Sequence, residues 1–263
     1  MILVLAGTRD ATDIARGFLE KGIDVTATAA TAYGAELLRN ACCTDVICGR
    51  YDTEGLEALI GEKKARVVVD ATHPYAATVS QNAICACERT GATYIRYERE
   101  GGAYPDAVHV DTYQQACSYL EKREGNVLVT TGTNNIGAFV PLIRKSRVVA
   151  RVLPCASSLE KCAEAGLGPD SIIAMKGPFS KEMNKAIIKE CDISFLVTKD
   201  GGAQGGTPEK IDACRECGVC AVMIDRPHVN YPRSFGSVEK TVHDAAALIG
   251  QEHDSYETRK DRW

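Results

Sequence analysis

The sequence lacks a long apolar run, an excess of basic residues and a complete phosphate-binding or cluster-binding motif. Apolar residues nowhere approach the roughly 20 in succession that a bilayer-spanning helix needs, so we expect no membrane contact. Lys and Arg number 31 against 35 Asp and Glu, which gives a formal net charge of -4. This balance provides no positive field for nucleic acid, and an anionic ligand must instead be met by local clusters of Arg and Lys.

A signal peptide is also missing from the start of the sequence, and the 12 cysteines are scattered through apolar segments. We therefore expect reduced thiols and a cytoplasmic location. Cys214, Cys217 and Cys220 resemble the start of an iron-sulfur motif, but no cysteine follows at the next required spacing. Cys85 and Cys87 are two apart in a helical pattern and point away from each other. We expect no bound metal.

Short β-branched runs alternate with helical patterns along the chain. Strands are expected at 2–6, 25–28, 46–48, 67–70, 94–96, 127–130, 148–152, 172–175, 193–197 and 219–224. Helices of the first half are expected at 10–21, 33–40, 53–62 and 74–90. This alternation predicts an α/β protein whose sheets are parallel and doubly wound.

The 263 residues suffice for two domains of ordinary size. A polar stretch from Glu98 to Asp106 interrupts the alternation, which then begins again. We expect a Rossmann-like domain over 1–124, a second over 125–250, and a polar tail over 251–263 that frays. The active site is expected in the cleft between the two domains.

Two turns of similar sequence follow the first strand of each half. Gly7 with Thr8 and Gly132 with Thr133 both join a strand to a helix. A glycine lets backbone amides approach a phosphate at the positive end of the following helix, although it can equally serve only a tight turn. Neither turn has the full G-x-G-x-x-G spacing or the phosphate loop of an NTPase. The second strand of each half ends without an acid to hold a ribose, which favours NADPH over NADH.

A cluster of reactive side chains directly follows the apolar run 67–69. The segment 70–76 carries a carboxylate, a hydroxyl, an imidazole and a phenol, and Pro74 is expected to be the first helical residue. Polar groups at this end of a strand face the ligand crevice of an open α/β sheet. The alternatives are that His73 is an N-cap, that Tyr75 only lines a pocket, and that Asp70 bonds only to local amides.

Basic residues follow three strands of the second half, in the segments 176–180, 199–207 and 225–227. One such lysine can simply extend its side chain to solvent. Three of them, together with the glycine run 201–206, predict a mobile entrance to a ligand site between the two sheets, and this entrance is expected to accept anions.

The chain resembles the precorrin-6A reductases of corrin (vitamin B12) biosynthesis from Met1 to about Gly250. The resemblance rests on the segments 3–8, 70–76, 130–134, 151–154, 176–180, 197–210 and 226–227. Of these, the string Asp-Ala-Thr-His-Pro-Tyr-Ala at 70–76 is specific. A serine is common in the family after the aspartate at 200, and Gly201 stands there instead.

The resemblance implies reduction of one double bond of precorrin-6A, or of its cobalt form, by NADPH or NADH. The substrate is an anionic tetrapyrrole whose carboxylates need basic partners. The basic candidates are Arg9, Arg50, Arg96, Arg151, Lys176, Lys199 and Arg226.

Roles within this chemistry follow from position. His73 and Tyr75 are the expected proton donors and Asp70 the group that orients them, unless solvent supplies the proton. The expected cofactor-binding residues are Gly7, Thr8, Arg9, Thr131, Gly132, Thr133 and Arg151. The expected substrate-binding residues are Thr72, Lys176, Ser180, Lys199, Asp200 and Arg226. Two alternatives stay open: another NAD(P)-dependent reductase of the same architecture, and a non-enzymatic module that senses a dinucleotide.

Overall fold

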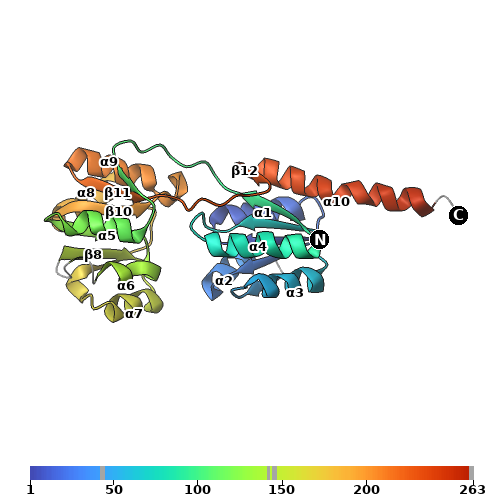
Figure 1. The fold of residues 1–263 in the computed structure, drawn as a ribbon, viewed down its shortest axis with the longest axis horizontal. Coiled ribbons are helices and arrows are strands. Elements are labelled where there is room, and N and C mark those ends of the chain that lie inside the picture. The colour runs from blue at the N-terminus through green and yellow to red at the C-terminus, as the bar shows by residue number, and fades with distance from the viewer. Residues whose placement is uncertain (42–44, 141–142, 144–146, 261–263) are drawn as a thin grey trace. The chain divides into compact units, whose positions relative to one another are not determined.

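The computed structural model describes residues 1–41, 45–140, 143 and 147–260. The chain divides into two compact units (Figure 1). Unit 1 contains Met1–Glu100 and Pro227–Trp263, and unit 2 contains Gly101–Arg226. In the part of the chain that the structure describes, none of the helices combines the length and the apolar character needed to cross a membrane.

Unit 1 is a parallel sheet with helices on both faces. Its strands are β1 (Ile2–Ala6), β2 (Val25–Ala29), β3 (Val46–Cys48), β4 (Val67–Ala71), β5 (Thr93–Tyr97) and β12 (Ser234–Phe235). Its helices are α1 (Arg9–Leu19), α2 (Ala32–Ala41), α3 (Thr53–Lys63), α4 (Ala77–Thr90) and α10 (Val238–Lys260).

Alternate residues of β1 enter two different cores, as the period of a strand requires. Ile2 and Val4 pack with α1 and α10 on one face, and Leu3 and Leu5 pack with α3 and α4 on the other (Figure 1). The strand is therefore buried on both sides, which explains its continuous apolar sequence.

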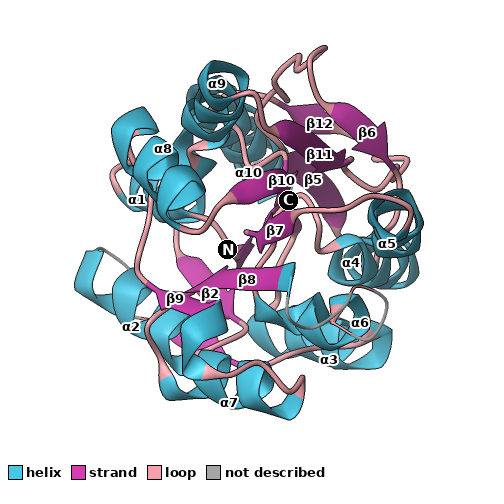
Figure 2. Cartoon of the chain, turned by 90° about the vertical axis from the view of Figure 1, so that its left-hand side faces the viewer, coloured by secondary structure: helices cyan, strands magenta, loops and turns pink. Residues whose placement is uncertain are grey.

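Unit 2 repeats this arrangement. Its strands are β6 (Val108–Val110), β7 (Asn126–Val129), β8 (Val148–Val152), β9 (Ile172–Ala174), β10 (Ile193–Lys199) and β11 (Cys220–Ile224). Its helices are α5 (Tyr113–Glu121), α6 (Ile136–Phe139), α7 (Ala156–Glu164), α8 (Lys181–Glu190) and α9 (Thr207–Cys217), with short 3₁₀ helices η1 (Thr133–Asn135), η3 (Pro169–Ser171) and η4 (Ala203–Gly205). Figure 2 shows α8 and α9 on one side of its central strands and α6 and α7 on the other.

The two sheets have the same topology. Their orders are β3-β2-β1-β4-β5-β12 and β9-β8-β7-β10-β11-β6, and neighbouring strands pair in parallel throughout the described residues. Both have the doubly wound strand order. In this order the first three strands extend the sheet in one direction, and the fourth strand lies on the other side of the first. The reversal falls between β1 and β4 in unit 1, and between β7 and β10 in unit 2. The ten strands expected from the sequence are all present.

The sixth strand of each sheet was not expected and moves the unit boundaries. Val108 pairs with Val222, so residues before 125 already belong to unit 2. Phe235 pairs with Tyr97, so the chain returns to unit 1 after Arg226. The expected division at 124 and 125 is therefore wrong. The reason is that neither missed strand is an apolar run: β6 carries His109 between two valines, and β12 has only two residues.

The C-terminal segment also differs from the expectation of a frayed tail. Helix α10 continues to Lys260, and residues 261–263 lie outside the described residues. Val242 and Ala245 are buried against α1, and Gly17 leaves room for Val242. The apolar face of this helix thus completes the core of unit 1.

Candidate functional site

The turns after β1 and β4 lie directly against each other at the point where the sheet of unit 1 reverses. A Cβ atom on Gly7 would stand 3.0 Å from the backbone nitrogen of His73 and 3.1 Å from the Cα of Thr72. The hydroxyl of Thr8 donates to the carbonyl oxygen of Ala71 at 3.1 Å. Gly7 is therefore required by close backbone packing, which was one of its two sequence interpretations.

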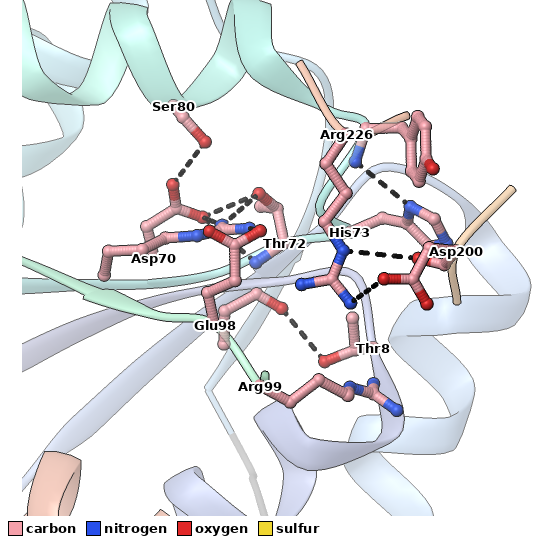
Figure 3. A network of polar contacts seen from close by, with 12 residues as sticks. Thr8, Asp70, Thr72, His73, Ser80, Glu98, Arg99, Asp200 and Arg226 are labelled. Carbon is pink, nitrogen blue, oxygen red and sulfur yellow. Dashed lines mark hydrogen bonds and ion pairs between the residues drawn. The ribbon is translucent and has the colours of Figure 1, made fainter. Parts of the chain in front are cut away.

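Asp70 is the centre of a buried network at the end of β4 (Figure 3). Its Oδ1 accepts hydrogen bonds from the backbone N–H of Thr72 at 3.0 Å, from the Thr72 hydroxyl at 2.6 Å and from Arg96 Nη1 at 2.9 Å. Its Oδ2 accepts from the hydroxyls of Ser80 at 2.6 Å and Tyr94 at 2.7 Å. The side chain of Asp70 is 0% exposed, and the partners named here all lie within unit 1.

Arg96 is the cation of this network and is equally buried. Its Nη1 also donates to the Thr72 hydroxyl at 3.1 Å, and its guanidinium carbon lies 5.1 Å from the ring centre of Tyr231. Burial alone would lower the pKa of Arg96, but the combined attraction of Asp70, Tyr231, Glu98 and Tyr94 outweighs it and the pKa is raised. Arg96 thus pairs with Asp70 inside unit 1.

His73 and Tyr75 lie at the edge of the network, where a ligand can reach them. His73 is exposed and Tyr75 is half-buried, and their ring centres are 5.6 Å apart. His73 Nδ1 accepts the backbone N–H of Tyr75 at 3.3 Å.

The start of α4 differs from the expectation. The helix begins at Ala77 with Ala76 as its N-cap, and Pro74 and Tyr75 form a turn closed by the Ala76 N–H and the His73 carbonyl at 2.8 Å. Pro74 is therefore not the first helical residue, and His73 does not cap the helix. The alternative that made His73 an N-cap is wrong.

The N-terminus of α1, where a dinucleotide phosphate was one expectation, already holds a carboxylate. Asp10 in its first turn is buried, and its Oδ2 pairs with Arg99 Nη2 at 2.9 Å. A carboxylate at this position stabilises the helix dipole and would repel a second anion. Arg9 beside it is exposed.

The corresponding turn of unit 2 has a different construction. Gly132 has φ +82°, which favours glycine, and a Cβ atom there would meet nothing within 4 Å. No side chain caps η1, which starts at Thr133. The Thr131 hydroxyl oxygen is buried and makes no hydrogen bond among the described residues. This turn therefore leaves open space and an unsatisfied polar atom, as a phosphate-binding turn requires.

Strand β10, next to β7, ends in a loop held by an ion pair. Asp200 Oδ2 pairs with Arg226 Nη2 at 3.1 Å, and Asp200 Oδ1 accepts the Gly202 N–H at 3.0 Å (Figure 3). The Thr207 hydroxyl accepts the Gly201 N–H at 3.1 Å. The Lys199 ammonium lies 5.3 Å from the ring centre of Tyr113, whose hydroxyl is buried and makes no hydrogen bond among the described residues.

Two further predicted residues lie near the N-terminus of α8. Arg151 is 6% exposed, donates from Nη1 to Asn184 Oδ1 at 2.7 Å, and covers the ring of Phe179 at 4.2 Å. Burial lowers the pKa of Arg151 to about 10. Ser180 is the N-cap of α8, where its hydroxyl accepts the Met183 N–H at 3.2 Å, and Lys176 is exposed.

The predicted residues of unit 1 thus form one group. Unit 1 brings together Gly7, Thr8, Asp70, Thr72, His73 and Tyr75. Sequence reasoning missed Ser80, Tyr94 and Tyr231, which surround the same network. Tyr94 and Arg96 are two apart on β5 and so share a face, which is the one signal that could have linked them to Asp70.

The chain was compared with known proteins. Residues 1–248 match the family model described as precorrin-6x reductase CbiJ/CobK. The cobalt-precorrin-6A reductase of Priestia megaterium is 38% identical over 257 residues, covering 95% of this chain and 99% of that protein. The enzyme of the same name from Methanothermobacter thermautotrophicus is 36% identical over 233 residues, covering 87% and 77%.

A solved structure of CobK precorrin-6A reductase shares the fold. It aligns with a TM-score of 0.76 at 23% identity, covering 94% of this chain and 96% of that one. The family model and the relatives lead to one conclusion. The chain belongs to the precorrin-6x reductase family.

Proposed function

We propose that this protein uses NADPH to reduce one carbon-carbon double bond of cobalt-precorrin-6A or precorrin-6A in cobalamin biosynthesis. The observation that carries the proposal is the similarity over nearly the whole chain to proteins named cobalt-precorrin-6A reductase. The two Rossmann-type sheets support it, since each has a point of chain reversal where such folds bind ligands.

Unit 2 is the better candidate for the dinucleotide. The turn at Gly132 has room for a phosphate and a buried Thr131 hydroxyl without a partner, whereas the Gly7 turn is filled by the 72–73 backbone. We assign Thr131, Gly132 and Thr133 to the diphosphate. Strand β8 ends without an acid to hold a ribose and carries Arg151, which supports NADPH over NADH.

The turn after β4 in unit 1 is the better candidate for tetrapyrrole chemistry. A bound nicotinamide supplies a hydride to one carbon of the double bond, and the adjacent carbon takes a proton. His73 and Tyr75 carry exchangeable protons at the exposed edge of the Asp70 network, within reach of a ligand. Asp70 and Arg96 act as positioning residues, because they fix Thr72 and with it the backbone of this turn. Lys176, Lys199 and Arg226 are proposed partners for substrate carboxylates.

We also propose that the reaction takes place in the cytoplasm. The ten cysteines within the described residues are free thiols, which supports a reducing compartment. Cys42 and Cys43 lie outside the described residues.

An anaerobic absorbance assay tests the proposed function. Purified protein is mixed with cobalt-precorrin-6A or precorrin-6A and with NADPH or NADH, and both the dinucleotide and the coloured substrate are followed. We expect consumption of both in equal amounts, faster with NADPH. Binding of the dinucleotide without turnover of either tetrapyrrole would support the sensing module in place of the reductase.

A further inference from the structure

The buried guanidinium of Arg96 has donors that its hydrogen bonds do not use. Its Nη1 donates to Asp70 and to the Thr72 hydroxyl. Its Nε and Nη2 are buried and make no hydrogen bond among the described residues. Glu98 Oε1 lies 3.6 Å from Nη2, which is beyond hydrogen-bond distance. A guanidinium that is 0% exposed therefore needs a further partner of another kind.

The aromatic ring of Tyr231 is such a partner. The guanidinium carbon of Arg96 lies 5.1 Å from the ring centre, within the range of a cation–π interaction. The ring of Tyr231 also stacks on that of Tyr94, with centres 6.5 Å apart and planes inclined by 11°. Tyr94 and Arg96 both donate to Asp70, so Tyr231 contacts both residues of β5 that hold this carboxylate.

The backbone of the returning chain places Tyr231 against Arg96. Tyr231 belongs to the segment that brings the chain back to unit 1 and leads into β12. Directly before β12, the carbonyl oxygen of Arg233 accepts the backbone N–H of Arg96 at 2.8 Å, and Ser234 pairs with Arg96. Arg233 is itself held by Asp244 of α10 at 3.1 Å. The short strand β12 thus brings an aromatic side chain to the residue with which its backbone pairs.

Packing alone does not require an aromatic ring at position 231. The side chain also contacts the apolar core that α3 and α4 form on the sheet, where an aliphatic side chain of similar size would serve. The buried cation makes a different demand. The face of an aromatic ring is negative and stabilises a guanidinium that has lost its water, which an aliphatic side chain cannot do.

We infer that Tyr231 is a positioning residue, whose ring holds Arg96 in place and so fixes the turn after β4 through Thr72. The inference rests on the proposed function, because that turn carries the proposed proton donors. The order of the turn can also be followed without chemistry, since the backbone N–H of Thr72 is bound to Asp70 Oδ1 at 3.0 Å.

A change of the ring's charge distribution at constant shape tests this inference. Tyr231→Phe keeps the negative ring face and serves as the reference. Pentafluorophenylalanine incorporated at position 231 has nearly the same shape, but its ring face is positive. The matched control is Tyr119→Leu, which removes the ring under the Arg123 guanidinium, 3.6 Å away, in unit 2. Neither Tyr119 nor Arg123 is assigned to the substrate or the cofactor.

For each protein we would measure kcat and KM for cobalt-precorrin-6A, the Kd of NADPH, the thermal midpoint, and hydrogen exchange of the segment 70–76 by mass spectrometry. We expect pentafluorophenylalanine at 231 to lower kcat about 10-fold relative to Tyr231→Phe, because the loosened Arg96 lets the turn shift. Amides of 70–76 should exchange faster, while KM and the Kd of NADPH stay unchanged. Tyr231→Phe and Tyr119→Leu should match the wild type in kcat and in exchange.

Exchange rates of 70–76 that do not differ between Tyr231→Phe and the pentafluorophenylalanine protein would overturn the inference. Equal kcat values of these two proteins, in an active enzyme, would overturn it as well and leave Tyr231 a packing residue. The exchange measurement needs no turnover. It therefore separates this result from failure of the proposed function, in which the wild-type protein itself consumes neither NADPH nor the tetrapyrrole.

Discussion

His73 and Tyr75 are the individual residues on which the proposed chemistry depends most. If one of them supplies the proton, His73→Ala or Tyr75→Phe should lower turnover by about 10²- to 10⁴-fold, the usual contribution of a general acid. Neither side chain caps α4, so the thermal midpoint should change little. Turnover and thermal midpoint would be measured side by side. Near-normal turnover in both variants would mean that solvent provides the proton.

Gly7 and Gly132 look alike in the sequence but have different reasons to be glycine. Gly132→Ala should raise the Kd of NADPH by about 10-fold, or ~1.4 kcal/mol, because its Cβ enters the open space over the turn. Gly7→Ala should leave that Kd unchanged and lower turnover, because its Cβ displaces the backbone of Thr72 and His73. Titration of both variants with NADPH decides the question. The opposite pattern would return the cofactor to the turn after β1.

At the scale of elements, β4, β5 and α4 are joined through the buried Asp70 and Arg96 pair. Asp70→Asn would leave the buried Arg96 with only its longer ion pair to Glu98, at 3.6 Å, and we expect a loss of about 3–5 kcal/mol in the free energy of unfolding. Asp13→Asn breaks an exposed pair with Arg16, at 46% and 45% exposure, and should cost less than about 1 kcal/mol. Urea unfolding curves compare the two. A similar small loss in both variants would contradict the structural role of the network.

Five strands of each sheet could be predicted from the sequence because each is an apolar run bounded by turn residues, whereas β6 and β12 could not. The network around Asp70 could not, because Ser80, Tyr94 and Arg96 are brought to Asp70 only by the pairing of β4 with β5 and the packing of α4. The hydrogen bond from Arg151 to Asn184 was missed for the same reason, since the two residues lie 33 positions apart along the chain. A local sequence pattern therefore predicts individual strands, whereas the contacts between distant polar residues depend on how the strands and helices are connected and packed.

At the scale of the whole molecule, the chain leaves unit 1 after its fifth strand and returns to supply the sixth. Strand β6 stands in the corresponding place of the second sheet, so the two units share one topology although their strands are drawn from different parts of the chain. The repeated turn at Gly7 and Gly132 reflects this duplication. The two reversal points then differ in chemistry: a buried carboxylate network in unit 1, and an open glycine turn in unit 2.

The central claim is that a hydride passes from NADPH to a carbon of the tetrapyrrole. The most direct test uses NADPH deuterated at its hydride-donating carbon, with cobalt-precorrin-6A as substrate in ordinary water, and mass spectrometry of the product. If the hydride passes from NADPH to the tetrapyrrole, we expect a product that has gained one deuterium from the cofactor and one hydrogen from water. A product that carries no deuterium, or a tetrapyrrole recovered unchanged while NADPH stays bound, would contradict it.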